Sequence, residues 1–151
     1  MRLANKILLN LISIIVPIAV RWCERQQQTI LVSGQALLPN EIDIAKYVGV
    51  SHHERIRIKL CDKIPGPPKW ILSAVSKLIG VECSNFAGLT LGYGIFIRQD
   101  AFSHGLIAHE FRHVRQFEQA GSLASFLTRY ITEFLTYGYW NAPLEVEARD
   151  Q

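Results

Sequence analysis

Two histidines four residues apart, His109 and His113, constrain the fold of this chain more than any other feature of its sequence. They belong to the segment His-Glu-Phe-Arg-His, which has the form H-E-x-x-H. On a helix, residues four apart lie on the same face, so both imidazoles can reach one metal ion. Glu110 then lies beside the metal, where a general base for an attacking water is needed. The segment therefore predicts a helix that carries two zinc ligands and a base.

The composition is that of one folded domain, which we assign to residues 1–151. Of the 151 residues, 49% are hydrophobic and 19% are charged, which is typical of a globular chain. The net charge is only +3 and no block of Lys and Arg occurs, so we expect no nucleic-acid partner. The three cysteines are far apart and form no C-x-x-C pair, which favours a reducing, cytoplasmic location over a disulfide framework.

An apolar run from Ile7 to Val20 dominates the beginning of the chain. It predicts a helix over residues 5–28, with the glutamines at 26–28 as its polar end, within an N-terminal helical segment 1–28. Three residues interrupt the run: Asn10, Ser13 and Pro17. The run is also shorter than the ~20 residues of a spanning helix, and no small-x-small signal-peptide cleavage site follows it. Two readings stay open, a helix packed on the domain and a helix that lies on a membrane surface through residues 5–22.

The middle of the chain predicts a short helix, a strand and a break. Pro39 begins a helix that Gly49 can end. Residues 55–60 alternate polar and apolar side chains, which indicates a half-buried strand. The Pro-Gly-Pro-Pro segment at 65–68 forbids regular structure, and a helix is expected over 70–78.

The last third of the chain predicts a hairpin followed by three helices. Residues 86–98 suggest a strand or hairpin with a turn near Gly92. The motif helix follows, with Asp100 or Ser103 as its N-cap and Gly121 as its end. Apolar residues at three- and four-residue steps predict a helix over 123–135, and Asn141-Ala142-Pro143 begins another. We expect an α+β fold in which a small antiparallel or mixed sheet packs against the motif helix and against N- and C-terminal helices.

A catalytic zinc ion takes three protein ligands and keeps a fourth position for water. No histidine follows His113, so the third ligand is expected among the carboxylates after the motif: Glu118, Glu133, Glu145, Glu147 and Asp150. Glu145 and Glu147 are favoured because their separate helix can fold back toward the histidines. Residues two apart on a helix point about 200° apart, so only one of the two can face the metal.

His109, Glu110 and His113, followed after a helix by Glu145-x-x-Ala148, resemble the gluzincin class of zinc metallopeptidases in a minimal, single-domain form. The resemblance covers about residues 88–150. It implies a zincin-like fold whose metal-site core is 86–151, one Zn²⁺ ion, and Glu145 as the third ligand, with Glu147 as the alternative. It also implies that a strand at 94–98 lines the cleft.

The activity that this resemblance implies is hydrolysis of a peptide bond in a peptide or protein substrate, with Glu110 as general base. The oxyanion of such a reaction needs a further donor. Four residues are candidates: Tyr130, Tyr137, Tyr139 and His104. We expect Arg112, Arg115, Glu118 and Glu133 to face solvent.

One departure from the class concerns Arg149, which stands where many gluzincins have an acidic residue, so a carboxylate contact to a metal-binding histidine is not expected from that position. The chain also ends six residues after Glu145, so we expect a shallow cleft or one that a partner completes. These features keep a second hypothesis open, a catalytically inactive, metal-stabilised binding or regulatory module.

Overall fold

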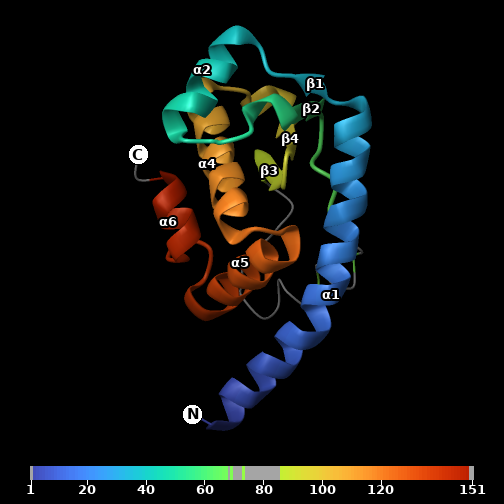
Figure 1. Cartoon of the computed structure of the whole chain (residues 1–151). Coiled ribbons are helices and arrows are strands. Elements are labelled where there is room, and N and C mark those ends of the chain that lie inside the picture. Colours follow the sequence, from blue (N-terminus) through green and yellow to red (C-terminus); the bar gives the residue numbers. More distant parts are fainter. Residues whose placement is uncertain (1, 68, 70–72, 74–85, 150–151) are drawn as a thin grey trace.

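The computed structural model describes residues 2–67, 69, 73 and 86–149 (Figure 1). Within these residues, helices lie on both faces of a mixed four-stranded sheet, which confirms the predicted α+β class. The helix predicted over 70–78 and the carboxylate of Asp150 lie outside the described residues.

The first helix, α1 (Arg2–Ser33), is longer than the predicted 5–28. The glutamines at 26–28 do not end it, because the next turn carries Ile30, which is fully buried and packs closely on Gly94 of the sheet. Tertiary packing therefore extends this helix beyond its apolar run. Among the described helices, none has the length and apolar character needed to cross a membrane.

The sheet has the strand order β1-β2-β4-β3, built from β1 (Gln35–Ala36), β2 (Arg57–Cys61), β3 (Gly88–Leu91) and β4 (Gly94–Arg98). β2 and β4 run parallel, whereas β1–β2 and β3–β4 are antiparallel pairs. The predicted hairpin is confirmed as β3–β4, and its turn holds Gly92 at a positive φ of 67°. Successive side chains of β4 point to opposite faces of the sheet, so that each face receives a hydrophobic layer.

The helices α2 (Pro39–Val48), α4 (His104–Ala120), α5 (Leu123–Tyr137) and α6 (Pro143–Arg149) begin close to where the sequence predicts. Two short 3₁₀ helices, η1 (His53–Arg55) and η3 (Gln99–Ala101), precede β2 and α4. The N-cap of α4 is Ser103, whose hydroxyl accepts a hydrogen bond from the Leu106 amide, and Asp100 lies in η3 instead. Gly121 ends α4 in a left-handed conformation, as predicted.

Two hydrophobic clusters hold the layers together. One lies between the sheet and the helices α2 and α4, around Ile95 and Phe111. The other lies between the opposite face of the sheet, α1 and α5, around Phe96 and Ile30. α6 packs on α4 on the side away from α1, so α4 lies between the sheet and the last helix.

Candidate metal centre

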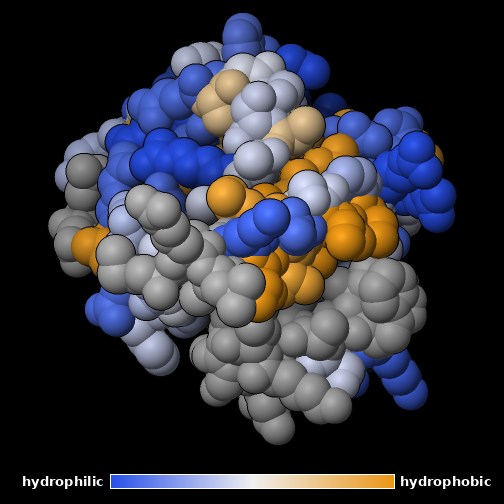
Figure 2. Space-filling model, turned by 90° about the horizontal axis from the view of Figure 1, so that it is seen from below, coloured by the Kyte–Doolittle hydropathy of each residue, from blue (hydrophilic) through white to orange (hydrophobic). Residues whose placement is uncertain are grey.

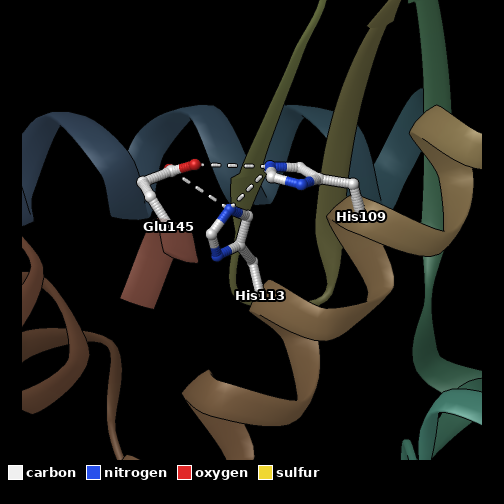
Figure 3. Close-up of side chains that lie close together, drawn as sticks. All are labelled: His109, His113 and Glu145. Carbon is white, nitrogen blue, oxygen red and sulfur yellow. Dashed lines mark hydrogen bonds and ion pairs between the residues drawn. The ribbon is translucent and has the colours of Figure 1, made fainter. Parts of the chain in front are cut away.

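Three side chains from two helices meet at the centre of the molecule (Figure 3). His109 and His113 occupy consecutive turns of α4, and their Nε2 atoms are 3.1 Å apart. Glu145 reaches them from α6, with Oε1 3.3 Å from Nε2 of His113 and Oε2 3.5 Å from Nε2 of His109. The histidines and the glutamate are distant in sequence, so the packing of α6 on α4 creates the group.

Buried hydrogen bonds fix the position of α6. The Glu133 carboxylate accepts a 2.8 Å hydrogen bond from the Leu144 amide at the start of α6, where a negative charge is favourable. Arg112 donates to the Ala148 carbonyl at the other end of the helix at 3.0 Å. Arg112 is buried, and the Glu133 side chain is only 13% exposed. The prediction that these two residues face solvent was wrong, because α6 packs over Arg112 on α4 and its first turn bonds to Glu133 on α5.

Glu147, the alternative third ligand, contacts other residues. Its carboxylate pairs with Arg115 at 2.7 Å and accepts a 3.1 Å hydrogen bond from Gln116. Arg115 also donates to the Val48 carbonyl, so it links α4 to α2 and is not a purely solvated side chain as predicted. Glu118 likewise accepts hydrogen bonds from the amides of Ser51 and His52, which contradicts its predicted solvent-facing role. Of the two glutamates, the structure brings Glu145 to the histidines.

The three side chains lie close enough together to hold one zinc ion. Ligand bonds of ~2.1 Å at tetrahedral angles place neighbouring donor atoms about 3.3 Å apart. Here the two Nε2 atoms are 3.1 Å apart, and each lies 3.3 or 3.5 Å from a different oxygen of the Glu145 carboxylate. With one donor atom per residue, the three atoms lie within 4.8 Å of one another. Oε2 of Glu145 is also buried, with no hydrogen-bond partner among the described residues. A buried carboxylate oxygen without a partner is costly, and a bound cation would satisfy it. The residues therefore fit a His₂Glu zinc site.

Gln116 sets the tautomer of His113. The Gln116 amide nitrogen donates to the Leu144 carbonyl at 3.0 Å and to Glu147, which fixes the orientation of the amide group. Its Oε1 can then only accept, and it lies 2.8 Å from Nδ1 of His113. Nδ1 of His113 therefore carries a proton, so Nε2, which faces Glu145, is the ring nitrogen that can bind a metal once it has lost its own proton. A metal-binding imidazole needs this arrangement.

The electrostatics of the group favour a charged Glu145. Burial alone raises the pKa of this carboxyl, but the adjacent imidazoles of His109 and His113 outweigh burial and hold the pKa far below its usual range. Burial opposes protonation of His113, whose pKa is nevertheless raised by the adjacent Glu145 and Glu110 carboxylates. Negative charge thus accumulates around the histidines, and a divalent cation there would be stabilised by it.

Glu110 lies in the same pocket as the three candidate ligands. Thr90 on β3 donates a 2.6 Å hydrogen bond to its Oε2. Burial raises the pKa of Glu110, although His113 and Thr90 partly oppose this. A carboxylate with a raised pKa is better matched to accepting and returning a proton near neutral pH.

The backbone of β3 approaches Glu110 closely at Gly88. A Cβ atom at this position would overlap Oε1 of Glu110 and lie 2.7 Å from its Cδ. Glycine is therefore required at Gly88 for the observed position of the carboxylate.

The pocket has a volume of about 110 Å³ and mainly apolar walls. β3 forms one wall, so the expectation that the strand at 94–98 lines the cleft was wrong; β4 lies inside the sheet, between β2 and β3. Trp22 and Cys23 of α1 form another wall, beside Phe126 and Leu127 of α5. The site therefore includes residues outside the predicted core 86–151.

The four candidate oxyanion donors separate into two pairs. Tyr130 and Tyr139 line the pocket, whereas the Tyr137 side chain is 55% exposed and His104 contacts Asn40 at the surface. The Tyr130 hydroxyl donates a 2.6 Å hydrogen bond to Oε1 of Glu145, so it orients the ligand carboxylate. Burial and the Glu145 charge raise the pKa of Tyr139 to about 12, so its hydroxyl keeps its proton at neutral pH.

Sequence reasoning missed three contributors to the site: Gly88, Thr90 and Gln116. Gln116 had a signal, because it lies three residues after His113 and therefore on the same face of α4. Gly88 and Thr90 had none, since only the pairing of β3 with β4 and its packing on α4 bring them to Glu110.

No protein-family model, curated protein or solved structure matches this chain. The geometry of the site therefore carries the functional proposal.

Proposed function

We propose that this chain is a zinc-dependent hydrolase, a metallopeptidase of the gluzincin kind in a zincin-like fold. One observation carries the proposal. His109, His113 and Glu145 bring two imidazole nitrogens and a carboxylate to one point, and Glu110 lines the same pocket. Three protein ligands without a fourth are characteristic of catalytic zinc sites, whereas structural sites are closed by four.

Each side chain has a role in this reaction. A zinc ion bound by the three ligands would lower the pKa of a water and polarise the substrate carbonyl. Glu110 accepts the proton of the attacking water and returns it to the leaving amine, so the amine leaves as a neutral product and Glu110 regains its charge. Tyr139, whose protonated hydroxyl lines the pocket, is the candidate donor to the developing oxyanion.

Metal analysis tests the zinc site directly. We expect the purified full chain to contain about one zinc ion per molecule. A chelator should remove the zinc together with hydrolysis of a mixture of fluorescence-quenched peptides, and added Zn²⁺ should restore both.

His109→Ala and His104→Ala form a matched pair of variants on the same helix. Loss of zinc is expected only for His109→Ala, because His104 lies at the surface beside Asn40. Peptide hydrolysis that survives complete zinc removal would contradict the proposed mechanism, and a chain that never retains zinc would contradict the site.

Gly88→Ala is expected to reduce hydrolysis about 100-fold while zinc content stays the same. The new methyl group must displace the Glu110 carboxylate, because its three nearest heavy atoms all belong to Glu110, and a displacement of ~1 Å at the reacting centre can cost about that factor. Steady-state kinetics with zinc quantification measures both quantities. Gly105→Ala is the control, since its Cβ would meet only the Ser103 hydroxyl at 3.9 Å. Equal activity of the two variants would contradict the role assigned to Gly88.

A further inference from the structure

The first half of α1 is only partly covered: most apolar side chains between residues 11 and 22 are half-buried, and Val20 and Trp22 pack against the cluster around Phe96 and Ile30. Between Lys6 and Trp22, no described side chain is buried. Burial begins with Cys23 and continues at Ile30, where α1 packs on the sheet and on α5. In Figure 1, the beginning of α1 extends beyond the other described helices.

Large apolar side chains are exposed on opposite sides of this half of the helix. Ile7, Leu9 and Ile14 are 54%, 65% and 63% exposed. At about 100° per residue, Ile7 and Ile14 lie within about 20° of each other, whereas Leu9 lies about 200° from Ile7. A protein partner in a groove covers one face of a helix. Exposed apolar side chains on both sides of the helix favour an apolar environment that contacts both sides over a groove that covers only one.

The charges around this segment are positive. The first 23 residues contain three basic residues and no acidic one. These are Arg2, Lys6 and Arg21. They flank the apolar run, and Lys6 and Arg21 are exposed. Figure 2, which views the molecule from the end where α1 begins, shows apolar side chains gathered next to hydrophilic ones. Basic residues that flank an apolar helix are attracted to anionic lipid headgroups.

We propose that the first half of α1 inserts into the surface of a membrane that contains anionic lipids. From Ile7 to Val20 the helix is about 21 Å long at 1.5 Å per residue. With its axis along the membrane surface, the basic residues at both ends stay at the level of the lipid headgroups. The Ser13 hydroxyl donates to the Asn10 carbonyl at 2.8 Å, so this polar group is satisfied within the helix.

The insertion places the candidate metal centre next to the lipid. Trp22 and Cys23, which line its pocket, follow Val20 within one helical turn. Tryptophan is also favoured at the boundary between lipid and water. Lipid binding does not depend on the zinc site, so it can be tested independently of hydrolysis.

Sedimentation of the full chain with lipid vesicles tests the proposal. We expect the chain to bind vesicles of phosphatidylcholine with phosphatidylserine at least tenfold more tightly than phosphatidylcholine alone. The triple variant Ile7→Gln, Leu9→Gln, Ile14→Gln should weaken this binding by about 100-fold, because three side chains lose their burial in lipid. Glutamine favours helices, and unchanged circular dichroism would show that the variant folds.

The matched control removes three exposed apolar side chains elsewhere: Val32→Gln, Leu38→Gln and Tyr47→Gln. It should bind vesicles like the unmodified chain. Equal loss in both triple variants, or equal binding to both kinds of vesicle, would overturn the proposal. A chain that stays unbound but forms a dimer, which the Ile7, Leu9 and Ile14 variant abolishes, would also overturn it and identify a second copy as the occupant.

Discussion

Glu110→Gln is expected to keep the zinc ion and to lower kcat for peptide hydrolysis by about 10²- to 10⁴-fold, the usual contribution of a general base. Glutamine has the shape of glutamate, and its amide oxygen can still accept the hydrogen bond from Thr90. It cannot take a proton from water. Because Glu110 is not among the three candidate ligands, zinc content should remain at that of the unmodified chain. Single-turnover kinetics together with metal analysis measures both quantities.

The control for this variant is Glu118→Gln, which makes the same chemical change on the same helix. Glu118 lies outside the pocket and contacts the amides of Ser51 and His52, so its substitution should leave kcat unchanged. Full activity of Glu110→Gln would refute the base assignment. A chain that binds zinc and unfolds without it, yet hydrolyses no peptide, would instead support the inactive, metal-stabilised module.

Local signals predicted the helices that carry the site. Ser103 and Ser122 were recognisable as N-caps, and Gly121 was recognisable as a terminator, because each satisfies backbone groups that its helix leaves unpaired. The alternating residues before Cys61 predicted β2, and the paired glycines predicted the β3–β4 turn. These signals act within a few residues, so the sequence alone is sufficient to find them.

Contacts between elements that are distant in the sequence could not be predicted from local signals. Arg112 has a charged side chain of the kind that usually faces solvent. In the structure α6 packs over it, and its guanidinium donates a hydrogen bond to the Ala148 carbonyl near the end of that helix. The polar glutamines at 26–28 are typical of a helix end. The helix α1 nevertheless continues past them, because Ile30 packs on the sheet. In both cases tertiary burial outweighs local preference. The two interpretations of the N-terminal helix, one that packs on the domain and one that lies on a membrane surface, are compatible. One half of α1 packs on the sheet and the other half is more exposed.

The choice between the two glutamates of α6 also required the structure. Glu145 and Glu147 point about 200° apart on their helix, and their spacing does not show which of them points toward the two histidines of α4. The bonds of the α6 backbone to Arg112, Gln116 and Glu133 set that rotation.

Glu145→Gln is therefore expected to weaken zinc binding by more than 100-fold, whereas Glu147→Gln should weaken it by less than tenfold. The first variant removes a negatively charged ligand 3.3 Å from His113 and leaves a neutral amide of the same shape. The second leaves all three ligands in place. It removes the charge that pairs with Arg115 and changes an acceptor of the Gln116 amide, which still donates to the Leu144 carbonyl. Loss of such an outer contact costs at most about 10- to 100-fold, and here one of its two bonds persists.

Competition with a chromophoric zinc chelator measures both affinities, and circular dichroism of the zinc-free proteins separates ligand loss from unfolding. Equal weakening in the two variants would show that the charge of α6, and not the donor set, holds the metal. A larger loss in Glu147→Gln would mean that α6 rotates when zinc binds and that Glu147 is the ligand. The expected order follows from Glu145 Oε2, which is buried and has no hydrogen-bond partner in the described part of the chain, while both carboxylate oxygens of Glu147 are already bonded to Arg115 and Gln116.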